Sequence, residues 1–362
     1  MNYIEKALNV LNKIDKEGYQ AYIVGGAVRD YLLNIDFDDI DICTNMPSSE
    51  LAKLFTLKKN NGHEYLSFTC MIDKYKFEIT HFRKDISYKD HRHPVVAEVE
   101  SLDEDLARRD FTINALALDN RMTIIDEFGG RSDLRHKVIK MIGNPDVRFD
   151  EDALRMLRAL YFSSKLGFTI EDETLNSIIR NKKLLECLSF ERIFDHFKRI
   201  LYGKYDNGIN YIIEYDLFEY IPKFKKLLAC VDKTCLKKDL EVYYYLKYNE
   251  LFSNNNKVKK DASTLKLLLN CSYDKYVIFN NIDLIHEYKN LLTKLGYYNE
   301  FKKIISGFKI KKDSELLVSK KEISDMFDGK KISLAIEYVT RLVLDNKIEN
   351  SREDILRSLE EF

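Results

Sequence analysis

The chain has 362 residues, enough for two or three domains with a sizeable core, and its 58 lysines and arginines almost balance 59 aspartates and glutamates. This balance decides neither for nor against a nucleic-acid partner, because an RNA-binding surface would need its basic residues gathered on one face. No apolar run reaches the roughly 18 residues of a membrane span. Six scattered cysteines without a C-x-x-C pair, and an N-terminus without a secretory signal, predict reduced thiols and a cytoplasmic location.

The first elements predict a phosphate-binding turn. The apolar spacing over residues 4–14 is helical, and a β-branched run, Tyr22–Val24, then stops at Gly25 and Gly26 before a second helical segment. A helix start attracts phosphate through its free N–H groups, and glycine lets the backbone approach a ligand closely. The glycine pair and Arg29 behind it are therefore candidate phosphate contacts, although a glycine pair is also typical of an ordinary tight turn.

Two carboxylates follow on the next predicted strand. Asp39 and Asp41 stand on either side of Ile40, so on a strand both carboxylates leave the same face while Ile40 and Ile42 point inward. Such close like charges repel unless a cation lies between them, and hard oxygen ligands suit Mg²⁺ bound together with water and substrate phosphate. Pairs of this kind are also typical of solvated acids, but the position shortly after the glycine turn predicts a metal site beside a phosphate site.

A hairpin and a charged loop come next. Residues 65–82 show the alternation of a β-hairpin, whereas residues 83–98 are charged and are expected to form a mobile loop. His91 and His93 in this loop lack a third ligand at a suitable spacing, so they do not define a metal site. Glu78, on the second strand of the hairpin, is a candidate for a third acid near the metal.

The texture of the sequence changes after Ile139. Up to that point strands and helices alternate, and beyond it periodic helical segments run to the C-terminus with almost no strand signal. This predicts an α/β region over 1–139 and an all-α remainder. Lysine-rich clusters in the remainder are possible RNA-facing surfaces, although such clusters are more often solvated helix faces.

Two further groups of charged residues carry candidate chemistry. Arg108 and Arg109 precede Asp110 and Asn114, and paired arginines beside an acid suit a triphosphate or a ribose. The same residues are also typical of a surface ion-pair cluster that caps a helix. The second group is the segment 150–160, which has its own periodicity.

In that segment Asp152, Arg155 and Arg158 recur every three residues and are therefore expected along one side of a helix. The ordinary explanation of this spacing is a helix with surface salt bridges. The more specific hypothesis is that these side chains select the base of the nucleotide. A carboxylate only accepts hydrogen bonds and a guanidinium only donates them. Asp152 would match the exocyclic amine of cytosine or adenine and Arg155 the neighbouring ring nitrogen, whereas uracil and guanine reverse that order.

The combination of VGGAVRD with the Asp39–Asp41 pair, then RRDFTINA, then EDALRMLRAL resembles the class II tRNA nucleotidyltransferases, the CCA-adding enzymes of bacteria. The resemblance implies addition of C, C and A to tRNA 3′ ends from CTP and ATP. It also implies a seahorse-shaped protein whose α/β nucleotidyltransferase head has a five-stranded sheet. The implied divisions are the head over 1–139, a helical neck with the nucleotide-selecting motif over 140–200, and a helical body and tail that bind tRNA over 201–362.

The resemblance also implies roles for single residues. Asp39 and Asp41 hold two Mg²⁺ ions and are catalytic, and the residues that contact the nucleotide are Gly26, Arg29, Arg109, Asp152, Arg155 and Arg158. Within this set, Asp152 and Arg155 form the template for the base and Arg158 reaches the triphosphate. Residues 84–97 match a flexible loop that helps the switch from CTP to ATP.

Four positions depart from the family pattern. Tyr161 stands where another arginine usually follows Arg158, so one triphosphate contact is missing or supplied elsewhere. His196 replaces a common acid of the neck, Asn34 replaces a turn glycine, and Leu66-Ser67 replace a Gly-Thr pair.

Three alternatives stay open at the level of sequence. A poly(A) polymerase of the same superfamily is the nearest, but its GRRF-type element beside the hairpin is absent. An enzyme that adds only CC is less favoured, because the 84–97 segment is intact. A non-catalytic RNA-binding protein would keep basic helices but would not need Asp39 and Asp41.

Overall fold

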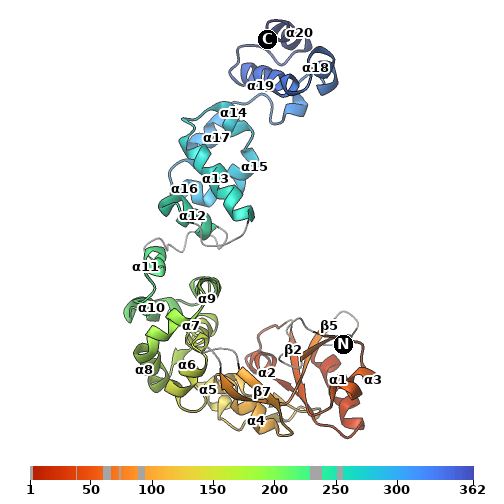
Figure 1. The fold of residues 1–362 in the computed structure, drawn as a ribbon, viewed down its shortest axis with the longest axis vertical. Helices are drawn as coiled ribbons and strands as arrows, with labels where there is room; N and C mark the ends of the chain where they lie inside the picture. The colour runs from red at the N-terminus through yellow and green to blue at the C-terminus, as the bar shows by residue number, and fades with distance from the viewer. Residues whose placement is uncertain are drawn as a thin grey trace. The chain divides into compact units, whose positions relative to one another are not determined.

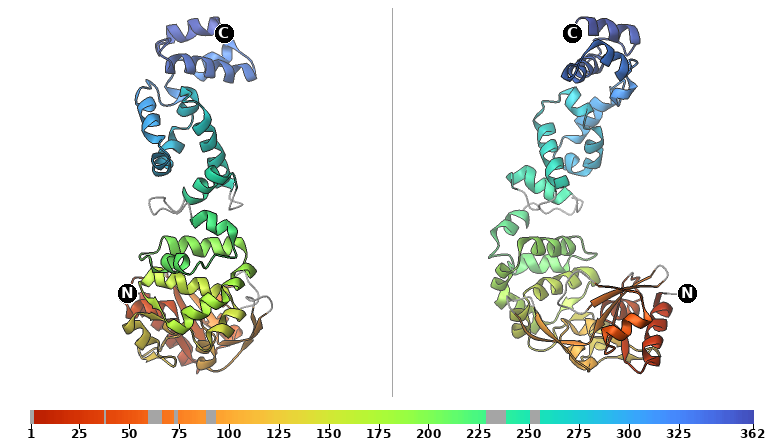
Figure 2. Two further views of the ribbon diagram at one scale, coloured as in Figure 1. Left: turned by 90° about the vertical axis from the view of Figure 1, so that its left-hand side faces the viewer. Right: turned by 45° about the vertical axis from the view of Figure 1, so that its right-hand side comes forward.

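The structure, a computed structural model, forms two compact units, Met1–Lys226 and Leu227–Phe362 (Figures 1 and 2). It describes residues 3–37, 39–59, 67–72, 75–88, 94–228, 239–250 and 256–362. The first unit contains an α/β part followed by helices, and the second unit is helical. The predicted change of texture after Ile139 is confirmed, with one short strand, β11, among the described residues that follow it.

A mixed β-sheet forms the centre of the α/β part (Figure 1). Its described strands lie in the order β3-β4-β5-β2-β1-β8-β9, with bounds Leu57–Lys59, Ser67–Ile72, Tyr75–His81, Ile40–Thr44, Ala21–Val24, Ala117–Leu118 and Ile124–Ile125. Only β2 and β5 pair in parallel among these strands, and this pairing places Asp41 opposite Glu78. The sheet therefore sets two acids of distant sequence position side by side.

The strand count differs from the five strands expected of the head. Seven described strands pair, because the two-residue strands β8 and β9 extend the sheet beyond β1. Strands this short show no alternation of apolar and polar residues, so the sequence pattern cannot reveal them. The hairpin expected within residues 65–82 is confirmed as the antiparallel pair β4 and β5.

The segment expected as a charged, mobile loop also contains strands. Arg83–Tyr88 forms β6, Pro94–Glu98 forms β7, and the two pair antiparallel with a register shift between Asp85 and Ser87. The expectation of a loop is wrong for these residues. A small exposed sheet carries charged side chains and has no apolar face, so the sequence shows no strand pattern there. The histidines His91 and His93 lie outside the described residues.

Short helices accompany the central sheet in the α/β part. The apolar face of α1, Tyr3–Lys16, is buried as its spacing predicted, through Ile4, Ala7, Val10, Leu11 and Ile14. The other elements of this part are α2 at Gly26–Leu32, α3 at Ser48–Leu54, α4 at Leu102–Ala107 and the 3₁₀ turn η1 at Thr112–Asn114.

The helices that follow η1 include α7, Leu154–Leu166, which packs against α9 and α10. Their bounds are Gly130–His136 for α5, Pro145–Glu151 for α6, Asp172–Asn181 for α8, Phe190–Leu201 for α9, Asn207–Glu214 for α10 and Pro222–Leu228 for α11. The strands β10, Val138–Ile139, and β11, Thr169–Ile170, pair in parallel beside them.

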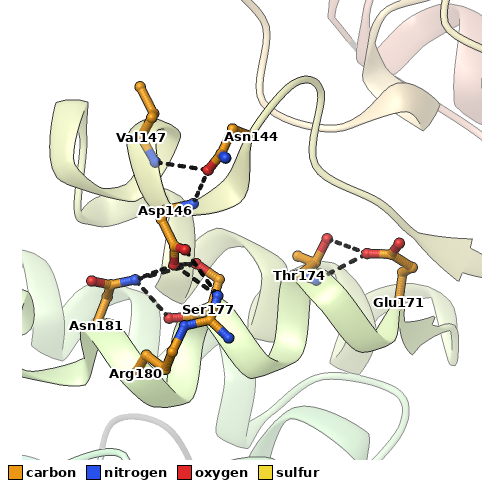
Figure 3. A network of polar contacts seen from close by, with 8 residues as sticks. All are labelled: Asn144, Asp146, Val147, Glu171, Thr174, Ser177, Arg180 and Asn181. Atoms are coloured by element: carbon orange, nitrogen blue, oxygen red, sulfur yellow. Dashed lines mark hydrogen bonds and ion pairs between the residues drawn. The ribbon is translucent and has the colours of Figure 1, made fainter.

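A polar clamp fixes α6 against α8 (Figure 3). Asp146 of α6 accepts hydrogen bonds from the side chains of Ser177, Arg180 and Asn181 of α8. Asn144 caps the start of α6 by accepting from the backbone N–H of Asp146. The clamp orients α6, whose C-terminal end leads directly into the predicted base-selecting residues.

The described residues of the second unit include two hydrophobic clusters. One joins α12 to α17 around Leu265 and Phe301, and the other joins α18, α19 and α20 around Val339 and Ile355. The bounds are α12 Asp239–Tyr248, α13 Asn256–Asn270, α14 Lys275–Phe279, α15 Ile282–Glu287, α16 Lys289–Lys294, α17 Tyr298–Ser306, η3 Asp313–Glu315, α18 Lys320–Met326, α19 Lys330–Leu344 and α20 Arg352–Glu360. No described helix is long and apolar enough to span a membrane.

Candidate active site

A single pocket of about 510 Å³ collects side chains from the sheet edge, from α2 and from α7. Seven of its lining residues are cationic and four are anionic. The lining residues are Gly25, Gly26, Arg29, Asp41, Arg83, Asp85, Arg108, Arg109, Asp110, Asn114, Asp152, Arg155, Arg158, Tyr161, Phe162 and Lys165.

The predicted nucleotide-binding residues and Asp41 line this pocket, whereas Asp39 and the candidate third acid, Glu78, do not. Asp39 directly precedes β2, which begins at Ile40, and its side chain is exposed. The inward orientation of Ile40 and Ile42 is confirmed, since both are buried. The structure thus brings together residues that lie up to 132 positions apart, from Gly26 to Arg158, and the functional roles assigned to them stay predictions.

The glycine turn is shaped by an arginine. Gly25 has φ +70° and ψ −130°, a conformation that side-chain-bearing residues rarely adopt. A Cβ atom at Gly25 would lie 2.8 Å from Nη1 of Arg109. The turn before α2 therefore needs glycine both for its backbone conformation and for the close approach of a pocket cation.

Asp41 is surrounded by charges of both signs. Burial raises the pKa of its carboxyl, and Glu78 and Asp39 add to the rise, whereas Arg109 opposes it. Ser67 donates a hydrogen bond of 2.6 Å to Oε1 of Glu78. Among the described residues no group of three or more His, Cys, Asp or Glu has metal-binding geometry.

A buried acid that sequence analysis missed holds both arginines of the RRD motif. Asp105 of α4 is fully buried, with Oδ1 at 2.8 Å from Nη2 of Arg108 and Oδ2 at 3.0 Å from Nη2 of Arg109. Burial by itself raises the pKa of Asp105, but the two guanidiniums outweigh it and hold the pKa below its usual range. The spacing of an acid three and four residues before two arginines was the signal available in the sequence.

A chain of polar contacts then crosses the pocket floor from α2 to α7. Arg29 donates from Nη1 to Oδ1 of Asn114 over 2.6 Å, and Asn114 donates to Oδ1 of Asp110 over 3.0 Å. The other oxygen of Asp110 lies 2.6 Å from Nη2 of Arg158. Both ends of the Asn114 amide take part in this chain of contacts, so the residue connects Arg29 to Asp110.

The predicted base-selecting pair lies where α6 meets α7. Asp152 is not on the helix, because its backbone is extended (φ −146°, ψ 98°) and α7 begins at Leu154. The expectation that Asp152 shares one helix face with Arg155 and Arg158 is therefore wrong, and the reason is that Oδ1 of Asp152 accepts from the N–H of Leu154 and breaks the helix there. All three side chains still line the pocket.

Local contacts fix the orientation of the pair. Arg155 is buried and donates from Nη1 to Oε2 of Glu151 and to the carbonyl of Arg148, each over 2.8 Å. Burial raises the pKa of Asp152, although Arg155 opposes the rise. Glu151 and Arg148 were not singled out from the sequence, where they resemble ordinary helical charges.

The wall formed by α7 includes an aromatic ring and a lysine that sequence analysis did not select. The guanidinium carbons of Arg29 and Arg158 lie 5.0 Å and 5.3 Å from the ring centroid of Phe162. Nζ of Lys165 lies 3.1 Å from Oδ2 of Asp30. Tyr161 also lines the pocket, so the position at which an arginine is expected is inside the site.

Comparison with known proteins identifies the family of the chain. The family model "Poly A polymerase head domain" matches residues 21–140, and "Probable RNA and SrmB- binding site of polymerase A" matches residues 167–228. The CCA-adding enzyme of Enterococcus faecalis is 33% identical over 392 aligned positions, which cover 98% of this chain and 95% of that protein. The chain belongs to the CCA-adding enzyme family. This membership favours a CCA-adding enzyme over the poly(A) polymerase alternative.

Other CCA-adding enzymes extend the likeness. That of Ligilactobacillus salivarius is 42% identical over 222 residues, which cover 61% of this chain and 55% of that protein. A crystal structure of the Bacillus stearothermophilus CCA-adding enzyme in complex with CTP is similar with a TM-score of 0.79 and 28% identity, covering 100% of this chain and 98% of that one. The α/β head and helical remainder are therefore those of the CCA-adding enzymes.

Proposed function

We propose that this protein adds C, C and A to the 3′ end of tRNA, using CTP and ATP and releasing pyrophosphate. The observation that carries the proposal is the pocket, which joins the acid-bearing strand β2 to the cations of α2 and α7 and to the Asp152–Arg155 pair. Membership of the CCA-adding enzyme family supports it. The same proposal includes the predicted division of the chain into a head over 1–139, a neck over 140–200, and a tRNA-binding body and tail over 201–362.

The cations of the pocket are suited to the triphosphate. Arg29 lies in the short helix α2, and Arg109 lies against Gly25, the residue before this helix. Arg158 reaches the pocket from the other side, with 39% of its side chain exposed. Because the buried acids Asp105 and Asp110 hold Arg109 and Arg158, these charges are oriented before the ligand arrives and lose little entropy on binding.

The nucleobase is selected by Asp152 and Arg155 in this proposal. Asp152 accepts a hydrogen bond from the exocyclic amine of cytosine or adenine, and Arg155 donates to the adjacent ring nitrogen. Glu151 and the carbonyl of Arg148 hold Arg155 in place, so a base with the reversed pattern leaves donors facing donors. The same pair therefore accepts CTP and ATP and rejects UTP and GTP.

The acids of the sheet edge fit a divalent cation. Asp41 lines the pocket, Asp39 stands two residues before it, and Glu78 is its neighbour on β5. Burial raises the pKa of Asp41 and repulsion by Glu78 and Asp39 adds to the rise; a bound cation would relieve this repulsion, and carboxylate oxygens are the ligands that Mg²⁺ prefers. When bound to Asp39 and Asp41, two Mg²⁺ ions would neutralise the charge of the reacting phosphates.

The reaction is an in-line displacement at phosphorus. The terminal 3′-hydroxyl of tRNA loses its proton to solvent and its oxygen forms a bond to the α-phosphorus, while the bond from the α-phosphorus to the bridging oxygen breaks and pyrophosphate leaves. Arg109 and Arg158 stabilise the negative charge on the departing group. Asp152 and Arg155 hold the base, so the α-phosphorus stays in one position for attack.

A stepwise extension assay tests the proposal. Purified protein and Mg²⁺ are combined with tRNA that ends before, within or after CC, and each nucleoside triphosphate is supplied alone. We expect CMP to be added twice and AMP once, with no addition of UMP or GMP. Incorporation of neither CMP nor AMP would overturn the proposal.

Two other outcomes would identify the rival functions. Sustained addition of AMP without CMP would assign a poly(A) polymerase, and tRNA binding without turnover would assign a non-catalytic RNA-binding protein. A third outcome, CMP addition that stops before AMP, would assign partial CC addition. The cytoplasmic location expected from the cysteine pattern stays a prediction.

A further inference from the structure

Lys165 is a pocket cation without an assigned role. It lies in the last turn of α7, lines the pocket, and keeps 33% of its side chain exposed. Arg29 and Arg155 line the same pocket but are only 4% and 6% exposed in their side chains. Lys165 is therefore open to a ligand that enters from solvent, as Arg158 is.

Lys165 and Arg158 share one side of α7. They are seven residues apart, which is two helical turns or about 10 Å along the axis. Tyr161 and Phe162 lie between them and also line the pocket. Two cations at this separation can contact different parts of one extended polyanion, with the aromatic residues between them.

The partner of Lys165 does not neutralise it. Asp30 is buried, and its Oδ1 lies 2.7 Å from Nε of Arg29 while its Oδ2 lies 3.1 Å from Nζ of Lys165. One carboxylate shared by two cations leaves the group with a net positive charge. An ammonium group also has three N–H donors, and the ion pair with Asp30 uses one of them.

We propose that Lys165 binds a phosphate group of the incoming nucleotide, with Asp30 holding its ammonium group at the pocket wall. The inference deepens the proposed function and rests on it, because the ligand is taken to be CTP or ATP. Lys165 stands one turn after Tyr161, so it supplies the phosphate contact that a tyrosine in place of an arginine cannot make. The competing explanation is that the Asp30–Lys165 ion pair only joins α7 to α2.

Binding measurements on the full chain separate these explanations. Dissociation constants for CTP and for cytidine are measured for the wild type, Lys165→Met and Lys165→Arg, with cytidine measured by competition. We expect Lys165→Met to weaken CTP binding about tenfold, the size of one charge-assisted hydrogen bond, and to change cytidine binding less than about twofold. Lys165→Arg should restore most of the CTP affinity, because it keeps the charge.

The matched control is Lys182→Met. Lys182 is also a partly buried lysine of the first unit, with 19% of its side chain exposed and Nζ 2.6 Å from Oε2 of Glu219, but it does not line the pocket. The Lys182→Met variant should have the same dissociation constants for CTP and for cytidine as the wild type. Melting temperatures of all variants show whether they remain folded, and a lowered value in Lys165→Met with equal losses for CTP and cytidine would assign a purely structural role.

An unchanged CTP affinity in Lys165→Met would also overturn the inference. Failure of the proposed function looks different: the wild type would then incorporate neither CMP nor AMP into tRNA, whatever its affinity for CTP. The two results are read from separate measurements, since the binding assay contains no tRNA.

Discussion

Arg158 of α7 and Asp110, which precedes η1, form an ion pair with 2.6 Å between Nη2 and Oδ2. The pair connects the helical part of the first unit to its α/β part, and Asn114 extends the connection to Arg29 of α2. These contacts therefore fix α2, which is proposed to hold the phosphates, relative to α7, which begins beside Asp152. Loss of the Arg158–Asp110 ion pair should therefore weaken the binding of CTP and of ATP in the same way.

The first prediction concerns that link. Asp110→Asn removes the charge that faces Arg158, and we expect affinity for CTP and ATP to fall by similar factors. The free energy of unfolding should fall by about 1 to 3 kcal/mol, because a buried acceptor of charged donors is lost. Urea unfolding and nucleotide binding measure the two effects. Asp146→Asn is the control, because this exposed residue also joins two helices but lies in the α6–α8 clamp, away from the pocket. An equal loss of nucleotide affinity in Asp110→Asn and Asp146→Asn would contradict the prediction.

The second prediction concerns the pH dependence of stability at Asp105. Its pKa is below the usual range in the folded protein, so its stabilising contribution is present above the ordinary pKa of about 4 and is lost as the pH falls through the lower folded value. Asp105→Asn should therefore unfold more easily than the wild type at pH 7, and the difference should narrow toward pH 3. Urea unfolding at pH 7, 4 and 3 measures it, and a difference that is constant with pH would contradict the assignment of Arg108 and Arg109 as its partners.

Sequence patterns predicted the parts of the site that are locally coded. The strand that ends at Gly25 and the alternation around Asp41 follow from side-chain spacing, and the structure has both. Spacing and hydrogen-bonding chemistry also singled out Asp152 and Arg155, and the structure brings them into the same pocket. Nothing local in the sequence relates residues so distant, so spacing alone could not have joined these two groups.

The acids that orient the arginines were missed for a physical reason. Asp105 and Glu151 lie three or four residues from their arginine partners, a spacing that is equally common in exposed helical ion pairs. Burial distinguishes the two cases, and burial depends on tertiary packing. The break at Asp152 was missed because a side-chain bond to the N–H of Leu154 replaces a helical one, while the three-residue spacing of the charges continues.

The third prediction concerns the glycine turn. Gly25→Ala places a Cβ atom 2.8 Å from Nη1 of Arg109, so we expect Arg109 to move and CTP affinity to fall. Gly18→Ala is the control, because Gly18 also has a positive φ but a Cβ atom there meets nothing within 4 Å. Both variants should lose about 1 to 3 kcal/mol of stability through backbone strain. Only Gly25→Ala should weaken CTP binding, and an equal loss in Gly18→Ala would refute the role given to the Arg109 contact.

The fourth prediction concerns base selection. Asp152→Asn replaces a pure acceptor with a group that both donates and accepts, so the carbonyl of uracil is no longer repelled. We expect UMP incorporation relative to CMP to rise by about 5- to 150-fold, which corresponds to the 1–3 kcal/mol cost of an unpaired buried polar group. The pH dependence provides a second test: burial raises the pKa of Asp152, so CTP discrimination in the wild type should weaken on acidification at a higher pH than an ordinary aspartate would give. Unchanged selectivity in Asp152→Asn would exclude the residue from the template.

The fifth prediction separates catalysis from folding at Asp41. Asp41→Asn removes the charge proposed to bind a metal ion, and we expect nucleotide incorporation to fall by at least about 100-fold, the effect typical of losing one electrostatic group in a transition state. The raised pKa of Asp41 shows that its charged form is disfavoured in the folded protein, through burial and through repulsion by Glu78 and Asp39. The melting temperature of Asp41→Asn in metal-free buffer at pH 7 should therefore equal or exceed that of the wild type. Asp36→Asn, an exposed acid nearby, is the control and should change neither property; retained incorporation in Asp41→Asn would remove Asp41 from the catalytic site.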